Sequence, residues 1–266
     1  MRKSFVAGNW KMNGQGEDAV TLARSVRDAV AGIDGVDVAI CPPFTSLAMV
    51  AWGIGGSPIK IGGQDLFWRE SGAFTGKISG GMLKTIGCTY VIVGHSECRG
   101  RFGKVDSDIN EETIRQFGDS DATVNLKIHA AFKNGLLPIV CCGETLAERQ
   151  AGKTDEIVGS QVRAALSGCS VDQVAQITIA YEPVWAIGTG QTCDTAEANR
   201  VCGLIRSVVG QVAGRVTADA IRIQYGGSVT SDNAAEILSQ EHIDGALVGG
   251  QSLKPEAFAK IVKAGA

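Results

Sequence analysis

Short apolar runs recur along the chain at fairly regular intervals. They are rich in valine and isoleucine, and they lie at residues 5–7, 38–40, 59–61, 90–93, 137–141, 177–181, 221–223 and 245–248. Near-continuous apolarity, in place of strict alternation, is typical of parallel strands that are buried on both faces. The pattern therefore predicts eight such strands.

Between these runs, apolar residues recur at the spacing of an α-helix. Apolar residues keep to one face in 19–30 and in 82–86, and a glycine follows each pattern within two residues. Asp194 and Glu197 have the spacing of a capping box ahead of a third apolar face at 201–208. No linker or change in composition divides the chain, so strand and helix alternate over its whole length.

Eight alternating units of strand and helix in 266 residues favour one architecture. Parallel strands joined by helices need right-handed crossovers, and eight of them in about 250 residues commonly close into a (β/α)8 barrel, the TIM barrel. We predict that residues 1–266 form a single α/β domain of this kind, with a doubly wound open sheet as the alternative. In a barrel the chemistry lies at the carboxyl ends of the strands, so functional residues are expected there.

Composition narrows the classes of function. The chain has 44% hydrophobic and 20% charged residues, a net charge of −3 and three histidines, which excludes a disordered protein and gives no basic surface for nucleic acid or an anionic membrane. Its eight cysteines form no C-x-x-C pair, so a zinc site is not expected. No apolar run is long enough for a membrane span or a signal peptide, and we therefore expect a cytoplasmic protein.

Two segments match nucleotide-binding patterns without meeting their structural requirements. Residues 147–154 fit a relaxed phosphate-loop pattern, but the residues inside it are helical in character and four of them in a row lack glycine. Gly14, Gly16 and Ala19 fit a dinucleotide fingerprint, yet strand two ends in a cysteine and two prolines where an acidic residue is required. We therefore expect no cofactor and no metal ion.

Candidate functional side chains follow strands one, four and six. Asn9 and Lys11 end strand one, and on an extended segment two residues apart they would point to the same side. His95 follows the buried fourth strand, and Glu182 ends the sixth, where the proline after it disfavours a helical backbone. Each has an ordinary alternative, namely an exposed lysine, a structural histidine or a solvated carboxylate. At the mouth of a barrel they would supply a cation, an imidazole and a general base.

Glycine-rich loops complete the predicted mouth. Ser228 ends a Tyr-Gly-Gly-Ser sequence after strand seven, and Gly249 and Gly250 follow strand eight; barrels often bind phosphate at these two strand ends. Tight turns are the alternative for these glycines. The apolar segment 183–190 is unusual for an exposed loop, and we interpret it as a lid over a ligand or else as a contact with a partner chain. The combination indicates proton abstraction next to a carbonyl on a small phosphorylated substrate.

The motifs at these strand ends closely resemble those of the triosephosphate isomerase family. The resemblance covers nearly the whole chain, and it is carried by residues 8–13, 72–76, 94–97, 141–149, 181–190, 225–229 and 247–255. The stretch Tyr181 to Gly190 is highly specific. The resemblance implies a cofactor-free isomerase of glycolysis and gluconeogenesis that interconverts dihydroxyacetone phosphate and D-glyceraldehyde 3-phosphate through an enediolate.

By this resemblance, each candidate residue takes a role. Glu182 is expected to move a proton between adjacent carbons, and His95, kept uncharged by the N-terminus of a following helix, to polarise the carbonyl. Lys11 and Asn9 would bind the substrate and stabilise its oxyanion, with Glu97 close to Lys11. The phosphate donors would be Gly188, Ser228, Gly249 and Gly250.

The resemblance also implies a lid and a homodimer. Residues 183–193 would close over the enediolate, and the loop around Thr75 would reach into the partner near its Asn9 and Glu97. A second hinge with Gln191 and Cys193, where the family commonly has lysine and alanine, would alter the rate of closing.

Three departures from the family bear on the dimer interface and not on the chemistry. Lys77 and Gly80 stand where the family usually has glutamate and proline, and Cys98 takes a place usually held by arginine. An insertion of about fifteen residues lies around 103–117, in which 110–115 would form a short helix or a flexible loop.

Two other functions are weighed against this one. Another sugar-phosphate barrel isomerase would share the phosphate loops but would not need the lid sequence, and an epimerase would add metal ligands. A non-catalytic barrel paralogue would be expected to lack Lys11, His95 or Glu182, and all three are present.

Overall fold

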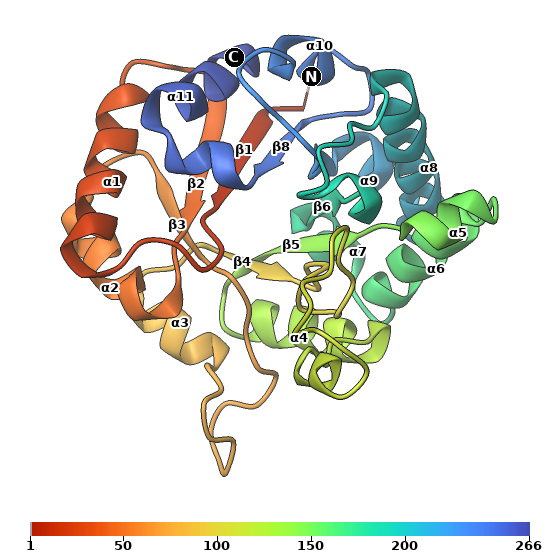
Figure 1. The fold of residues 1–266 in the computed structure, drawn as a ribbon, viewed down its shortest axis with the longest axis horizontal. Helices are drawn as coiled ribbons and strands as arrows, with labels where there is room; N and C mark the ends of the chain where they lie inside the picture. The colour runs from red at the N-terminus through yellow and green to blue at the C-terminus, as the bar shows by residue number, and fades with distance from the viewer. Residues whose placement is uncertain (1) are drawn as a thin grey trace.

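Eight parallel strands form a closed barrel in the computed structural model, which describes residues 2–266 (Figure 1). The strands are β1 (Ser4–Asn9), β2 (Val36–Cys41), β3 (Lys60–Gly63), β4 (Tyr90–Val93), β5 (Leu137–Cys142), β6 (Thr178–Tyr181), β7 (Arg222–Tyr225) and β8 (Gly245–Val248). Each strand pairs with the next, and β1 also pairs with β8, from Phe5 opposite Gly245 to Gly8 opposite Val248. The predicted TIM barrel is confirmed, and the alternative of an open sheet is wrong.

Helices surround the barrel on the outside (Figure 1). They are α1 (Gly16–Ala29), α2 (Phe44–Gly53), α3 (Gly80–Ile86), α4 (Asp121–Lys133), α5 (Leu146–Gln150), α6 (Thr154–Leu166), α7 (Val171–Gln176), α8 (Thr195–Ala213), α9 (Arg215–Ala220), α10 (Ala234–Leu238) and α11 (Pro255–Ala264). Short 3-10 turns span Thr113–Gln116, Val184–Ala186 and Gly250–Leu253. Within residues 2–266, no helix has the length and apolarity that crossing a membrane requires.

Two apolar layers explain why the strands read as nearly continuous apolar runs. On β1, Phe5 and Ala7 belong to a cluster inside the barrel, whereas Val6 belongs to the larger cluster that includes apolar residues of the surrounding helices. Successive side chains of a strand point to opposite faces, so both faces of each strand are buried. Full burial of a side chain such as Phe5 or Val6 contributes roughly 1.5–3 kcal/mol, and the same arrangement recurs around the barrel.

The ends of the helices agree with most of the predicted signals. Gly87 ends α3 with a φ of 98°, a left-handed conformation that favours glycine. The Asp194 carboxylate caps α8 by accepting hydrogen bonds from two backbone N–H groups of its first turn. The predicted capping box is only half correct, because the Glu197 carboxylate pairs with Arg149 and Arg200 in place of the cap backbone.

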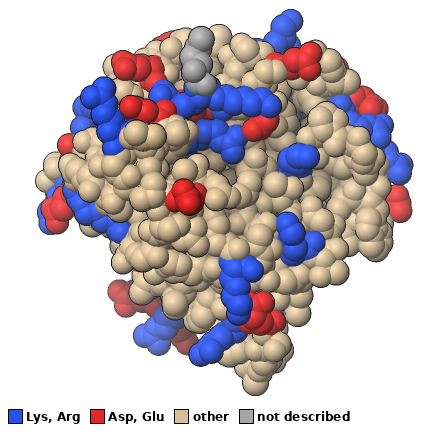
Figure 2. All heavy atoms as spheres, turned by 180° about the vertical axis from the view of Figure 1, so that it is seen from behind, with Lys and Arg blue, Asp and Glu red and all other residues tan. Residues whose placement is uncertain are grey.

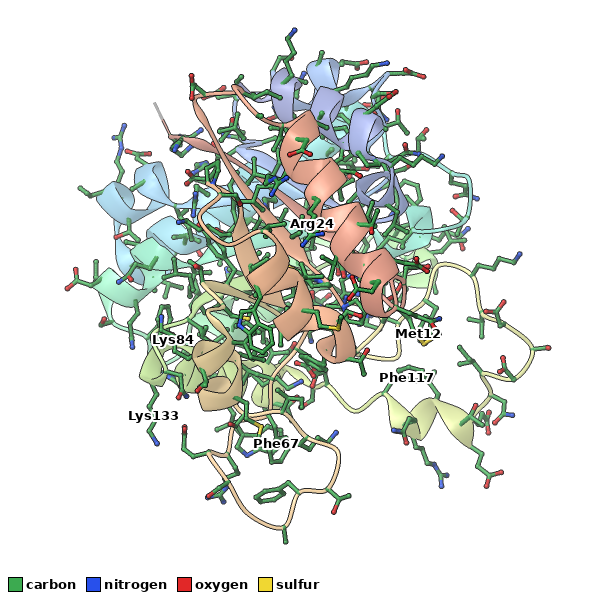
Figure 3. The ribbon with its side chains drawn as sticks, turned by 90° about the vertical axis from the view of Figure 1, so that its left-hand side faces the viewer. Met12, Arg24, Phe67, Lys84, Phe117 and Lys133 are labelled. Carbon is green, nitrogen blue, oxygen red and sulfur yellow. The ribbon has the colours of Figure 1, made fainter. Side chains whose placement is uncertain are left out.

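The connection between β3 and α3, residues 64–79, projects from the body of the molecule with Phe67 near its base (Figures 1 and 3). The rings of Phe67 and Phe74 pack at 4.8 Å, which ties the two sides of the loop together. Gly80, at the end of this loop, has no room for a side chain, since a Cβ there would lie 2.7 Å from the side chain of Asn134. Packing against Asn134, the residue directly after α4, therefore favours the glycine found in place of the family's proline.

The surface opposite the view of Figure 1 carries both signs of charge. Lys and Arg side chains are interspersed with Asp and Glu on that face (Figure 2). Such mixing is typical of a solvated surface without a long-range field of one sign.

Candidate active site

One cavity of about 590 Å³ lies at the carboxyl ends of the strands. Its lining includes every residue that the sequence analysis named as a site residue: Asn9, Lys11, His95, Glu97, Glu182, Gly188, Ser228, Gly249 and Gly250. These residues come from β1, β4, β6, β7 and β8 or from the loops that follow them. The barrel thus brings together groups that lie up to 241 positions apart in the sequence.

Lys11 faces the cavity for a different reason from the predicted one. β1 ends at Asn9, and Lys11 is not extended but has a φ of 51°, the left-handed region that non-glycine residues rarely adopt. The Asn9 side chain accepts a hydrogen bond from the Lys11 backbone N–H at 3.0 Å, and the Lys11 Nζ lies 2.5 Å from Glu97 Oε1. The unusual backbone and the ion pair together fix the position of the ammonium group.

Gln64 is a contributor that the sequence analysis missed. Its Nε2 donates to the backbone oxygen of Lys11 at 2.7 Å and to that of Cys41 at 2.8 Å. The residue directly follows β3, so it lies at the same end of the barrel as the other candidates. Its place at the end of the third strand is the signal in the sequence that could have predicted it.

His95 is buried and oriented by its own following turn. Its Nδ1 accepts the Glu97 backbone N–H at 3.2 Å, an arrangement that leaves Nε2 as the donor nitrogen of the ring. Nε2 lies 2.8 Å from Glu182 Oε1. The expected helix after His95 is wrong: the chain makes a single turn, which ends at Gly100 with a φ of 68°. The orienting group is therefore one backbone amide within this turn.

Glu182 is buried at the tip of β6, with 1% of its surface exposed. Its Oε2 accepts the backbone N–H of Ser96 at 3.0 Å. Burial alone would raise its pKa, but the adjacent His95 ring, the Ser96 amide and the Lys11 charge outweigh burial, so the pKa lies below its usual value. The carboxylate is consequently ionised at neutral pH, as a general base must be.

Two glycine loops line the opposite side of the cavity. Gly226, Gly227 and Ser228 follow β7, and Gly249 and Gly250 lead into the last 3-10 turn. Open space around Gly250 leaves its backbone accessible from the cavity. Backbone N–H groups in such loops are suited to an anionic oxygen.

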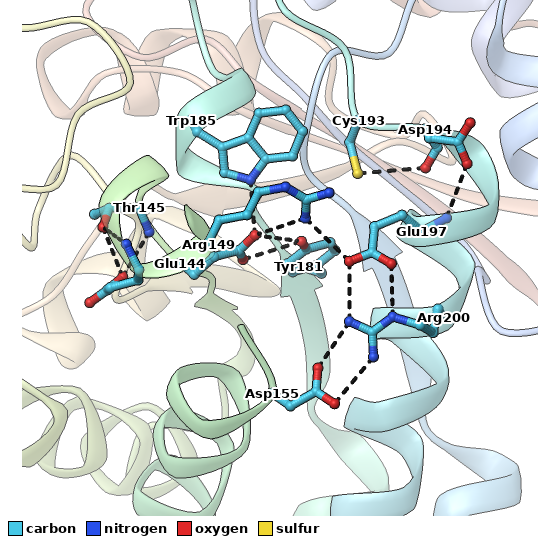
Figure 4. Close-up of polar contacts among 11 residues, drawn as sticks. Glu144, Thr145, Arg149, Asp155, Tyr181, Trp185, Cys193, Asp194, Glu197 and Arg200 are labelled. Atoms are coloured by element: carbon cyan, nitrogen blue, oxygen red, sulfur yellow. Dashed lines mark hydrogen bonds and ion pairs between the residues drawn. The ribbon is translucent and has the colours of Figure 1, made fainter. Parts of the chain in front are cut away.

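The first residues after Glu182 are buried against other residues of the same chain, and Figure 4 shows the contacts of Trp185 among them. Trp185 is 8% exposed, its Nε1 donates to Glu144 Oε1 at 2.9 Å, and the Arg149 guanidinium lies 4.5 Å from its ring centroid. The Tyr181 hydroxyl reaches the same carboxylate at 3.2 Å. Trp185 therefore packs within the chain and is not left for a partner, while Gly188 at the tip is exposed and lines the cavity.

A second cavity, of about 560 Å³, lies beside the projecting loop. Cys98 is half-buried there near Asp65 and Asp119, and the ammonium of Lys127 lies 2.7 Å from both of these carboxylates. A positive side chain thus already balances the acidic residues around Cys98. Burial raises the pKa of the Cys98 thiol to about 12, so it is neutral.

Comparisons with known proteins agree with this geometry. A family model described as triosephosphate isomerase matches residues 4–265. The chain is 51% identical to the triosephosphate isomerase of Moorella thermoacetica and 48% identical to that of Acetivibrio thermocellus, each over 262 residues and 98% of both chains. It also resembles the crystal structure of triosephosphate isomerase from Bartonella henselae, with a TM-score of 0.84, 37% identity and 98% of both chains covered.

Proposed function

The chain belongs to the triosephosphate isomerase family, and from this premise we propose how its cavity carries out the reaction. The enzyme is an isomerase that interconverts dihydroxyacetone phosphate and D-glyceraldehyde 3-phosphate, and the comparisons favour neither the other sugar-phosphate isomerase nor the non-catalytic paralogue. The observation that carries the residue assignments is that Glu182 Oε1, His95 Nε2 and the Lys11 ammonium face one cavity.

Proton transfer is assigned to Glu182. Its ionised carboxylate takes a proton from the hydroxyl-bearing carbon next to the carbonyl, which gives an enediolate, and returns a proton to the former carbonyl carbon. The hydroxyl proton of the first carbon passes to the former carbonyl oxygen by way of His95. The N–H at His95 Nε2 donates to the carbonyl oxygen, on which negative charge develops, and Lys11 with Asn9 stabilises the same charge. Donors of this kind are typically worth about 3–4 kcal/mol each in the transition state. Glu97 holds the Lys11 ammonium in place.

Phosphate binding is assigned to the glycine loops. The backbone amides of Gly188, Gly249 and Gly250 and the Ser228 hydroxyl would surround the phosphate at the far side of the cavity. Residues 183–193 would act as a lid that excludes water and keeps the enediolate from losing phosphate.

Calorimetric titration tests the phosphate assignment. 2-Phosphoglycolate, a phosphorylated mimic of the enediolate, should bind with a Kd in the micromolar range, and glycolate without the phosphate should not bind measurably. Ser228→Ala should weaken binding of the phosphorylated compound by about tenfold to a hundredfold, the loss of one hydrogen bond to a charged group. Equal affinity for glycolate and 2-phosphoglycolate would reject the loops as a phosphate site.

Three further proposals concern the whole chain. We propose a homodimer through the loop around Thr75, because large apolar side chains are exposed on this loop, at Phe74, and on the helix that follows it, at Met82. We also propose that residues 1–266 are one domain with an insertion at 103–117. A cytoplasmic location is supported by the eight cysteines, all of them free thiols.

A further inference from the structure

Gly103, in the connection between β4 and α4, lies directly against the backbone of the segment proposed to be the lid. A Cβ at this position would be 2.4 Å from the backbone oxygen of Val184, 2.5 Å from that of Ile187 and 2.9 Å from Thr189 Cγ2. Real Cβ atoms are not found so close to backbone oxygens. The present position of residues 184–189 is therefore compatible only with glycine at 103.

The two residues before Gly103 hold it in place. The Arg101 backbone N–H donates to Ser96 O at 2.9 Å, and its guanidinium bonds to the Glu148 carboxylate at the start of α5. The next residue, Phe102, packs edge to face with Phe117 at 5.1 Å, which closes the intervening residues into a loop. Gly103 is consequently attached to the turn after His95 and to α5, so it forms a fixed surface for the lid.

This surface also belongs to the wall of the active site. The same cavity that contains the candidate catalytic residues is lined by Arg101, Phe102, Gly103, Lys104, Asp106 and Ile109 on one side and by Ala186, Ile187 and Gly188 of the lid. A displacement of the lid at Gly103 would therefore open the cavity and move the Gly188 amide away from the phosphate.

We propose that Gly103 is a positioning residue that seats the lid over the cavity; this inference rests on the proposed function. Alanine at 103 forces the lid backbone and the loop at 101–103 apart by roughly 1 Å, and misplacements of this size can cost up to about 10²-fold in rate. A lid that seats poorly also exposes the enediolate. The C–O bond to phosphate then breaks, the enediolate electrons form a new C=C bond, and inorganic phosphate leaves while the remaining enol rearranges to methylglyoxal.

A matched pair of variants, Gly103→Ala and Gly118→Ala, tests the proposal. Both glycines lie in the same connection and neither has a positive φ, but a Cβ at Gly118 would meet nothing within 4 Å. We expect Gly103→Ala to lower kcat for isomerisation about tenfold to a hundredfold and to raise the ratio of phosphate released to triose isomerised at least fivefold. We expect Gly118→Ala to match the wild type in both.

The possible outcomes distinguish a failure of the proposed role of Gly103 from a failure of the proposed function. The proposed role of Gly103 would be overturned if Gly103→Ala had the kinetics of Gly118→Ala. It would also be overturned if Gly103→Ala had a reduced kcat but an unchanged release of phosphate. A wild type that does not isomerise triose phosphates would instead overturn the proposed function.

Hydrogen exchange on the wild type provides a test that does not depend on folding of a variant. Addition of 2-phosphoglycolate should protect the amides of 101–106 together with those of 184–190. Protection of the amides of 184–190 alone, with no change in those of 101–106, would also reject the proposed contact between Gly103 and the lid.

Discussion

Lys11 has a strained backbone at a position that we propose binds the substrate. Its left-handed backbone costs of order 1–3 kcal/mol, and the cost is offset by hydrogen bonds from the Gln64 amide and to the Asn9 side chain. The sequence analysis correctly predicted that Lys11 and Asn9 share the cavity, but for the wrong reason, because it took both residues to lie on an extended strand. A left-handed lysine was not predictable from the local sequence, because the Gln64 amide that holds its backbone oxygen lies 53 positions further along the chain.

Substitution of Gln64 tests whether this support matters to activity. Gln64→Leu keeps most of the side-chain volume but removes the donor to Lys11 O, so the backbone of Lys11 is expected to relax and its ammonium to move. We predict a fall in kcat/KM of about tenfold or more, measured by steady-state kinetics. Full activity in Gln64→Leu, with its fold verified by circular dichroism, would show that Lys11 holds its conformation without this amide.

The thiols offer a second test at the residue scale. Burial is the main cause that raises the pKa values of Cys98 and Cys193, each to about 12. Since the thiolate is the reactive form, at pH 8 these residues should react with iodoacetamide on the order of 10³-fold more slowly than free cysteine. Mass spectrometry after timed labelling measures this, with urea-unfolded protein as the control. Rapid labelling of either residue in the folded protein would contradict the burial.

At the scale of elements, the strands and the segment after β6 differ in how far they could be predicted. The eight strands were predicted to within one or two residues, because each is an apolar run buried on both faces. The segment after Glu182 was predicted to be a lid from its apolar composition, but the hydrogen bond of Trp185 with Glu144, which lies 41 positions before it, was not predicted. Likewise, the turn after His95 was taken for a helix, since Gly100 alone does not reveal its left-handed φ.

Replacement of Trp185 tests the anchor at the start of the lid. Trp185→Phe removes the N–H that donates to the buried Glu144 carboxylate, and such bonds to charged groups are worth about 1.5–3 kcal/mol. We predict a loss of about 2 kcal/mol in the free energy of unfolding, measured by urea denaturation, and a lower kcat. Trp52→Phe is the matched control, because Trp52 is 77% exposed, and it should change neither. Equal stability of the two variants would contradict the anchor.

At the scale of the whole molecule, closure of the barrel determines the site. Asn9 and Gly250 are brought to one cavity because β1 pairs with β8, a contact that no local pattern encodes. The alternation of strands and helices predicted the barrel, and the barrel in turn predicted which strand ends to examine. The alternation of strands and helices predicts neither the contacts with a second copy of the chain nor the conformation of 103–117.

The proposed dimer is tested by its mass in solution. Thr75→Arg places a long charged side chain at the tip of the projecting loop, where Thr75 is exposed, so it should disrupt docking without disturbing the barrel. We predict a dimer for the wild type and a monomer for Thr75→Arg in sedimentation velocity at micromolar concentration. Val216→Arg, at a position 85% exposed on α9, should remain dimeric. A wild type that sediments as a monomer would reject the proposal.

The most direct test of the account is the rate of interconversion of D-glyceraldehyde 3-phosphate and dihydroxyacetone phosphate, with the wild type and Glu182→Gln measured side by side. The amide keeps the size of Glu182 but cannot accept the proton, and general-base catalysis typically contributes about 10²- to 10⁴-fold. The account predicts rapid turnover by the wild type and a loss within this range in Glu182→Gln, with both proteins folded. Near-normal turnover by Glu182→Gln would contradict the assignment of Glu182 as the base.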